Sequence, residues 1–172
     1  LVKSDNKFRI VFTGNIGRFQ GLDTIVNAMK HLEDNQNIEL IFLGNGEHEN
    51  KIKKTASKLI GKSIYLISTK NIEYVNSMIA SADIGLVSLL DGVEKCAFPS
   101  KMSGYLSMNC PILVIANKNS EIYKITSKFN IGVSIDHTNP KDVSQLLLQL
   151  SFIQNFKSKY KDNIVHFMND YY

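Results

Sequence analysis

The sequence predicts an α/β fold in which one doubly wound, Rossmann-like parallel sheet of six strands is covered by helices. Short apolar runs rich in Ile, Val, Leu and Phe alternate with helical patterns along the 172 residues, which is typical of buried parallel strands joined by helices. The alternation repeats six times, and the simplest strand order for such a sheet is 3-2-1-4-5-6. No linker, repeat or low-complexity segment interrupts the pattern, so residues 1–172 are expected to form one domain.

Six apolar runs predict the strands. They comprise residues 7–14, 37–44, 63–68, 83–89, 111–116 and 131–135. Helical spacing of apolar residues predicts helices over residues 21–32, 47–60, 71–81, 100–108, 119–128 and 140–150. Asn139 before Pro140 and Asp142 is a typical helix start, since it offers a cap, a first-turn proline and an acid at the positive end. The remaining residues, 151–172, have an amphipathic pattern that predicts one more helix.

Composition narrows the class of protein. Hydrophobic residues make up 44% and charged residues 21% of the chain, which is ordinary for a globular domain. No apolar run could span a bilayer, and the N-terminus does not resemble a signal peptide. The net charge of +4 mildly favours anionic partners, but no basic stripe with interleaved aromatics indicates nucleic acid. Cys96 and Cys110 match no metal-binding spacing and indicate a reducing compartment, so we expect a cytoplasmic protein. We also expect no metal site and no bound cofactor.

In a doubly wound sheet the ligand binds beyond the carboxyl ends of the strands, near the reversal of strand order. This rule selects the loops at residues 14–21, 44–47, 68–71, 89–100 and 116–121. The first loop, "TGNIGRFQG", has three glycines, whose backbone freedom lets amide groups approach a phosphate. It lacks both the dinucleotide-binding and the P-loop spacing. Arg18 could hold a diphosphate, and a tight turn beside a solvated arginine is an equally good interpretation.

The stretch "FPSKMSGYL" places a basic residue at the start of a predicted helix. Ser100 can cap this helix, which explains the serine alone. Lys101 falls in the first turn, where the positive end of the helix disfavours a cation. A phosphate would reverse the sign of this interaction, because amides, hydroxyl and ammonium would converge on it. Ser100 and Lys101 are therefore predicted to bind an anion, while Tyr105 fits a buried helix face.

Two other loops have simpler interpretations. "GNGEHE" at residues 44–49 is interpreted as a turn with acidic residues at a helix start. His48 and His137 are interpreted as residues without a role in a site. Ser120 and Glu121 begin the helix after the fifth strand, where they either cap the helix and compensate its dipole or face a sugar hydroxyl.

Taken together, the motifs resemble the C-terminal, donor-binding half of a bacterial family 4 (group 1) glycosyltransferase with the GT-B fold. The resemblance is carried by "FTGNIGRFQGLDTIVNAMKHL", "IELIFLGNGEHE", "ISTKNIEYVNSMIASADIGLVSL", "FPSKMSGYLSMNCPILV" and "NSEIYKI", in the family's order over residues 8–150. The combination of "GNIG", "QGL", "PSK" and "NSEI" is most similar to transferases of capsule and O-antigen synthesis, some of which transfer acetamido sugars.

The resemblance implies a two-domain enzyme in which this domain binds a nucleotide-diphosphate sugar, with UDP favoured. A preceding N-terminal domain, absent from this chain, would supply the acceptor site and the catalytic histidine. We therefore expect the chain to be inactive by itself. The expected reaction is metal-independent and retains the anomeric configuration, and the expected acceptor is a lipid-linked saccharide at the inner face of the membrane.

Residue by residue, the resemblance places Gly14, Asn15 and Gly17 in the loop that faces the donor phosphates. Arg18 falls near the family's phosphate-binding arginine, and Gln20 stands where the family usually has a lysine. The cationic clamp of the loop is therefore expected to be weakened.

The other matches concern the base, the diphosphate and the sugar. Ser68 and Lys70 fall where backbone groups hold the base, and Lys101 follows Ser100 in the helix that meets the diphosphate. Cys96 and Gly104 occupy the positions of two family glutamates that hold the sugar nucleotide. Glu94 or Glu121 could replace one of these glutamates, and Ser120 is a further candidate for sugar binding.

Three other functions fit parts of the sequence. A receiver-type signalling domain needs an acidic pair after the first strand and an aspartate ending the third, where this chain has Thr13, Asn15 and Ser68. A nucleotide-sugar epimerase shares the GT-B fold but fits the motifs less well. A non-catalytic nucleotide-binding module would be consistent with the missing glutamates. The motifs favour the transferase.

Overall fold

The computed structural model describes residues 7–92 and 100–171, with a six-stranded, entirely parallel sheet at its centre. The strands lie in the order β3-β2-β1-β4-β5-β6, which confirms the predicted order. They are β1 (Phe8–Thr13), β2 (Ile38–Leu43), β3 (Ile64–Ile67), β4 (Ile84–Ser88), β5 (Ile112–Ile115) and β6 (Gly132–Ile135). Both faces of the central strands are buried, as their continuous apolar runs predicted.

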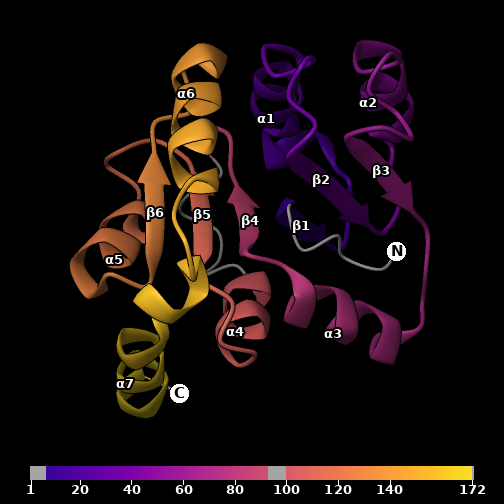
Figure 1. The fold of residues 1–172 in the computed structure, drawn as a ribbon. Coiled ribbons are helices and arrows are strands. Elements are labelled where there is room, and N and C mark those ends of the chain that lie inside the picture. Colours follow the sequence, from indigo (N-terminus) through magenta and orange to yellow (C-terminus); the bar gives the residue numbers. More distant parts are fainter. Residues whose placement is uncertain (1–6, 93–99, 172) are drawn as a thin grey trace.

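Helices cover both faces of the sheet (Figure 1). They are η1 (Arg18–Gln20), α1 (Leu22–Lys30), α2 (Glu49–Thr55), α3 (Ile72–Ser81), α4 (Ser100–Leu106), α5 (Glu121–Phe129), α6 (Pro140–Ser151), η2 (Phe156–Lys159) and α7 (Lys161–Tyr171). On one face α1 packs against α2 and α6, whereas α3 and α4 contact the opposite face of the central strands. α2 is shorter than predicted, because it ends at Thr55 and residues 56–59 form turns before β3.

Two of the predicted helix caps, Ser120 and Asn139, are present. The side-chain oxygen of Asn139 accepts a hydrogen bond from the backbone N–H of Lys141 at 3.0 Å. Ser120 Oγ accepts one from the backbone N–H of Tyr123 at 3.4 Å and donates to the Asn117 carbonyl at 2.7 Å. α6 and α5 therefore begin where local sequence chemistry placed their starts.

The C-terminal segment differs from its prediction. The single helix expected over residues 151–172 is replaced by the end of α6, the short η2 and α7. Asn155 interrupts the helix because it adopts a left-handed conformation with φ of +52°. The turn that follows buries the rings of Phe156 and Tyr160, and Phe156 packs edge-on against Phe8 at 5.3 Å between centroids. Packing of these rings on the core outweighs the continuous helical pattern.

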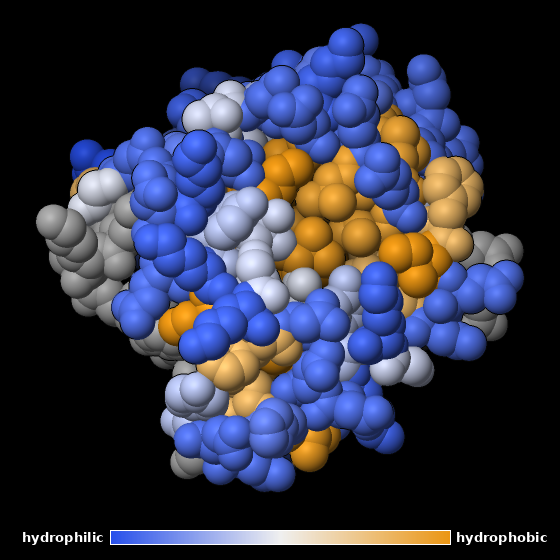
Figure 2. Space-filling model, turned by 90° about the vertical axis from the view of Figure 1, so that its left-hand side faces the viewer, coloured by the Kyte–Doolittle hydropathy of each residue, from blue (hydrophilic) through white to orange (hydrophobic). Residues whose placement is uncertain are grey.

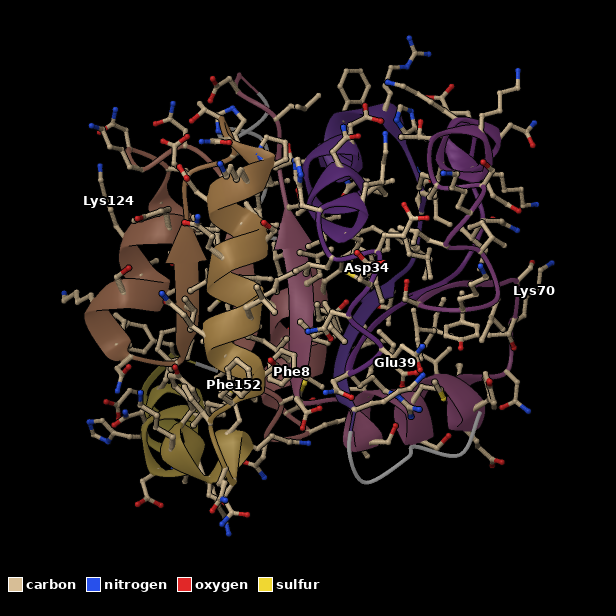
Figure 3. The ribbon with its side chains drawn as sticks, turned by 45° about the horizontal axis from the view of Figure 1, so that its top comes forward. Phe8, Asp34, Glu39, Lys70, Lys124 and Phe152 are labelled. Carbon is tan, nitrogen blue, oxygen red and sulfur yellow. The ribbon has the colours of Figure 1, made fainter. Side chains whose placement is uncertain are left out.

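One ion pair is buried in the core at the N-terminal ends of the strands. The register of β1 and β2 sets Arg9 opposite Glu39, and Arg9 Nε lies 2.6 Å from Glu39 Oε1. Arg9 Nη1 also donates to Ser81 Oγ at 2.8 Å, and Glu39 lies close to α3 in Figure 3. The backbone N–H of Arg9 donates to Asp83 Oδ2 at 2.7 Å. These polar contacts tie α3 to the sheet, and the apolar strand patterns did not predict them.

The side of the molecule that carries α5, β6, α6 and α7 has a broad hydrophobic area set among polar side chains (Figure 2). Hydrophobic residues of β6 and α6 that are only partly buried include Val133, Ile135 and Leu146. Within the described residues, no helix combines the length and the apolar character needed to cross a bilayer.

Candidate functional site

The carboxyl ends of β1 and β4 separate from each other at the centre of the sheet. β1 pairs with β2 along its full length, but with β4 only through Ile10–Ile84 and Val11–Gly85. The strand order reverses here, because the chain moves outward from β1 in one direction and then returns to β4 on the other side. This edge of the sheet is therefore where a doubly wound fold is expected to bind its ligand.

Tyr105 of α4 closes the gap between the two strands. Its ring lies so near Gly85 that a Cβ added there would be 2.5 Å from the ring. The hydroxyl accepts a hydrogen bond from the backbone N–H of Thr13 at 2.9 Å and lies 3.2 Å from Thr13 Oγ1. Burial raises the pKa of Tyr105, so the hydroxyl stays neutral. The predicted burial of Tyr105 is confirmed, whereas its bond to β1 was not predicted.

Tyr105→Phe is expected to lower the free energy of unfolding by about 1–2 kcal/mol, because the Thr13 N–H loses its acceptor away from water. Tyr65→Phe is the matched control, since the Tyr65 hydroxyl donates to the Lys62 carbonyl at the surface. Urea denaturation of both variants measures the difference. Equal losses would show that the Thr13 bond does not stabilise the end of β1.

The loops after β1 and β2 interlock through their backbones. The N–H of Gly14 donates to the Leu43 carbonyl at 2.8 Å, and the N–H of Ile16 donates to the Asn45 carbonyl at 2.8 Å. Gly44 has φ of +148°, and a Cβ added there would lie 2.1 Å from the Gly14 carbonyl oxygen. The "GNGEHE" segment is thus more than the turn predicted from its sequence, because it supports the first glycine loop directly.

Two neighbouring hollows open at this edge and share Thr13, Gly14 and Asn15 as a common wall. We name them the β3-side hollow and the α4-side hollow. The β3-side hollow has a volume of about 510 Å³ and is completed by Leu43, Gly44, Asn45, Thr69, Lys70, Ile72 and Val75. The α4-side hollow has a volume of about 460 Å³ and is completed by Ile79, Lys101, Gly104 and Tyr105.

Lys101 brings a positive charge into the α4-side hollow. Its ammonium donates to Gln20 Oε1 at 2.8 Å and lies 4.1 Å from the centroid of the Phe12 ring. The side chain is half-buried, and burial lowers the pKa of Lys101 to about 8. In the described part of the chain no carboxylate pairs with this ammonium. The site therefore holds a desolvated cation that an anionic ligand could neutralise.

Comparisons with known proteins agree with this geometry. Residues 1–165 match the family model described as glycosyl transferases group 1. The chain belongs to this family. It is 28% identical over 136 residues to the probable glycosyltransferase WbjE of Pseudomonas aeruginosa, covering 79% of this chain and 34% of WbjE. It is 25% identical over 144 residues to the putative colanic acid biosynthesis glycosyl transferase WcaI of Escherichia coli K12, covering 83% of this chain and 34% of WcaI.

Solved structures show the same fold. The C-terminal domain of the group 1 glycosyl transferase LpcC from Francisella tularensis superposes with a TM-score of 0.75 at 14% identity, covering 96% of this chain and 86% of that domain. Anabaena HepE in complex with UDP-glucose has a TM-score of 0.75 at 8% identity, covering 96% of this chain and 44% of HepE. These likenesses confirm the resemblance to a C-terminal GT-B domain, and this chain spans about a third of the length of WbjE and WcaI.

In this group 1 glycosyltransferase domain, Arg18 lies apart from the cation of the α4-side hollow. Arg18 Nε and Nη2 donate to the two carboxylate oxygens of Glu47 at 2.8 and 3.2 Å. This pairing raises the pKa of Arg18 and lowers that of Glu47. The Arg18 side chain is 65% exposed and lines neither hollow. Arg18 is thus exposed and paired with Glu47, and its contact with a phosphate stays a prediction.

The other residues predicted in the glycine loop are brought to the site. Gly14 and Asn15 line both hollows. Gly17 is buried behind them, where an added Cβ would lie 2.9 Å from Asn15 Nδ2. Gln20 reaches the site through its contact with Lys101.

Among the described residues that were predicted to hold the base or the sugar, only Lys70 lines one of the two hollows. Lys70 lines the β3-side hollow from the outer edge of the sheet (Figure 3), whereas Ser68 is exposed and outside the lining. Ser120 is buried and caps α5, and Glu121 is exposed in the first turn of that helix. Glu94 lies outside the described residues.

Only some of the residues predicted near the start of α4 lie in the part of the chain that the structure describes. Ser100 begins α4 as predicted, and Cys96 lies outside the described residues. Gly104 lines the α4-side hollow, and a Cβ added to it would meet no atom of the described residues within 4 Å. The described residues therefore leave open space where the family resemblance would place a glutamate.

His137 has contacts that sequence reasoning missed. Its Nε2 lies 3.2 Å from Asp91 Oδ2 and its Nδ1 lies 3.4 Å from Asp136 Oδ1. Asn117 Nδ2 donates to Asp91 Oδ1 at 3.0 Å, so these side chains join the loops after β4, β5 and β6. Residues so distant in sequence gave no signal of their proximity. Nowhere in the described ranges do three or more His, Cys, Asp or Glu side chains group as a metal site would require.

Proposed function

We propose that this domain binds the diphosphate of a nucleotide-sugar donor and presents the sugar for transfer. The observation that carries this proposal is the half-buried ammonium of Lys101, which among the described residues has an amide and an aromatic ring as neighbours but no carboxylate. It borders the hollow beside Gly14 and Asn15, at the reversal of strand order. A diphosphate would supply the missing negative charge and accept the remaining ammonium hydrogens.

The two hollows suit the two ends of such a donor. The β3-side hollow combines the apolar side chains of Ile72 and Val75 with the polar groups of Asn45, Thr69 and Lys70. An apolar wall with a few polar groups is suited to a nucleoside. The α4-side hollow would then hold the diphosphate and the sugar. UDP is favoured as the nucleotide because HepE, which has the same fold, binds UDP-glucose.

The proposed chemistry depends on where negative charge develops when the donor sugar is transferred. Breaking the glycosidic bond to the diphosphate leaves negative charge on the leaving phosphate oxygens. Lys101 and the backbone amide of Asn15 would stabilise this charge from fixed positions. We propose a retaining, metal-independent transfer, with the catalytic groups and acceptor site in a preceding domain. Arg18 would contribute to this site only by leaving Glu47.

The biological setting is a further part of the proposal. The name of WcaI, with its reference to colanic acid biosynthesis, supports a role in making capsule, O-antigen or exopolysaccharide. We propose an acetamido sugar as the donor sugar and a lipid-linked saccharide as the acceptor, used in the cytoplasm at the inner face of the membrane. The domain by itself would bind the nucleotide without catalysing transfer.

Lys101→Ala in the full-length protein is expected to weaken UDP binding by at least about tenfold, because the diphosphate loses its charged partner. Lys128→Ala is the matched control, since the Lys128 ammonium also lies over a ring, 5.1 Å from the centroid of Phe129 in the last turn of α5. Isothermal titration calorimetry with UDP and GDP measures both variants. Wild-type affinity in Lys101→Ala would contradict the proposed site.

One observation favours a second function, that of a non-catalytic nucleotide-binding module. Neither hollow has a carboxylate among the described residues that line it, and Gly104 leaves open space beside the proposed diphosphate site. Incubating the full-length protein with radiolabelled UDP-sugars and a membrane extract distinguishes the two functions. Transfer of label to lipid-linked saccharide supports the transferase, and tight UDP binding without transfer supports the module.

A further inference from the structure

We propose that Gln20 is a positioning residue that holds the Lys101 ammonium at the α4-side hollow, so that α4 supplies the cation which the loop after β1 lacks. This inference rests on the proposed function, because it assigns the roles of two residues within the donor diphosphate site. Gln20 was predicted to contact the nucleotide itself. The contacts of its side chain indicate a different role.

The contact joins two elements that are 81 residues apart in the sequence. Gln20 is the last residue of η1, and its backbone N–H donates to the Gly17 carbonyl at 3.3 Å. From this position its side-chain oxygen accepts a hydrogen bond from the Lys101 ammonium. The stem of Lys101 reaches it past Gly14, where an added Cβ would lie 3.3 Å from Lys101 Cε. Because Gly14 has no side chain, it leaves room for the side chain of Lys101.

An amide is well suited to hold this ammonium. The lysine stem is flexible and its ammonium is strongly hydrated, so a free Lys101 would extend into water. A carboxylate at position 20 would hold the ammonium but neutralise it, and a second lysine would repel it. The neutral oxygen of Gln20 fixes the position and leaves the full charge available to a phosphate. The Phe12 ring below the ammonium adds a favourable cation–π contact.

The other described residues around the ammonium do not compensate its charge. Gly14, Asn15 and Thr13 face it from β1 and the loop that follows, and Ile79 from α3. Tyr105 is the other titratable group among the described residues of this hollow, and burial raises its pKa, so it stays neutral. In η1, Arg18 is paired with Glu47. The charge state of the hollow between pH 7 and 9 therefore depends on Lys101.

Three results are expected from UDP titrations of the full-length protein between pH 7 and 9. Wild-type affinity falls up to about tenfold from pH 7 to pH 9, because a free-state pKa of about 8 leaves most of Lys101 uncharged at pH 9. Gln20→Glu weakens binding about tenfold at pH 7, because the new carboxylate neutralises the ammonium. Gln20→Met weakens binding several-fold and moves the pH midpoint upward, because the released ammonium returns to water.

The control is Gln149→Met, which changes an exposed glutamine of α6 and should leave both the affinity and the pH midpoint unchanged. A wild-type affinity and pH profile in both Gln20 variants would overturn the positioning role while leaving the donor site intact. Loss of affinity in Gln20→Met with an unchanged midpoint would also overturn it, because that result indicates direct contact with UDP. If the wild-type protein binds no UDP at any pH, the proposed function itself fails, and this inference with it.

Discussion

Glu39→Ala is expected to lower the free energy of unfolding by about 3–5 kcal/mol, because it removes the carboxylate that pairs with the buried Arg9 guanidinium. The side chains of Arg9 and Glu39 are 1% and 3% exposed, so water cannot replace the lost carboxylate. A second cation, Lys7 Nζ, lies 3.8 Å from Glu39 Oε2 and would lose its partner as well. The variant therefore removes the carboxylate from a contact that joins β1 to β2.

Glu47→Ala is the matched control, because it also removes a glutamate from an arginine contact. Arg18 Nε lies 2.8 Å from Glu47 Oε1, but the side chains are 65% and 56% exposed. Water and salt replace such a surface contact, so we expect no measurable change in stability. Urea denaturation compares the two variants, and similar losses would contradict the importance of burial. Replacing both buried partners, in Arg9→Met/Glu39→Leu, should recover much of the stability lost in Glu39→Ala.

Gly44→Ala is expected to lower the free energy of unfolding by about 2–5 kcal/mol and to weaken UDP binding. The added Cβ would lie 2.1 Å from the Gly14 carbonyl oxygen, and a backbone atom cannot move aside as a flexible side chain can. The loop after β1 would have to shift, and that loop lines both hollows. Stability and nucleotide affinity should therefore fall together.

Gly61→Ala is the matched control, because it shows the effect of an unfavourable backbone conformation without a steric contact. Gly61 also has a positive φ, +78°, but a Cβ added there meets no atom within 4 Å. We expect a loss of about 1–2 kcal/mol from the left-handed conformation alone, with UDP binding unchanged. Thermal denaturation and calorimetry on both variants test the comparison. Equal effects on UDP binding would show that the Gly14 loop does not depend on its contact with Gly44.

Local sequence chemistry predicted the strands and most helix starts correctly. The apolar runs of β1, β2, β4 and β5 are buried because these central parallel strands are covered on both faces. Ser120 and Asn139 cap α5 and α6 because a cap depends only on residues within one helical turn. The same short range explains the failure over residues 151–172, where a local pattern suggested one helix and the packing of Phe156 and Tyr160 imposed a turn.

The candidate site was predicted in its position and only partly in its composition. The carboxyl-end rule selected the loop that begins at Gly14 and the loop that ends directly before Lys101, and both residues line the α4-side hollow. Arg18 was predicted beside them, but its side chain is bound to Glu47 at the surface. Sequence reasoning named Gln20 as a weaker substitute for a lysine, and only the structure shows that its side chain contacts Lys101.

The sequence by itself therefore determined the family, the parallel sheet with its strand order and the edge at which a ligand is expected. These properties depend on periodicity and on residues that are close together in the chain. Only the tertiary structure decided which side chains meet: Tyr105 with Thr13, Lys101 with Gln20, and Arg9 with Glu39. The physical reason is that such pairs lie 30 to 92 residues apart, and strand register and helix docking bring them together.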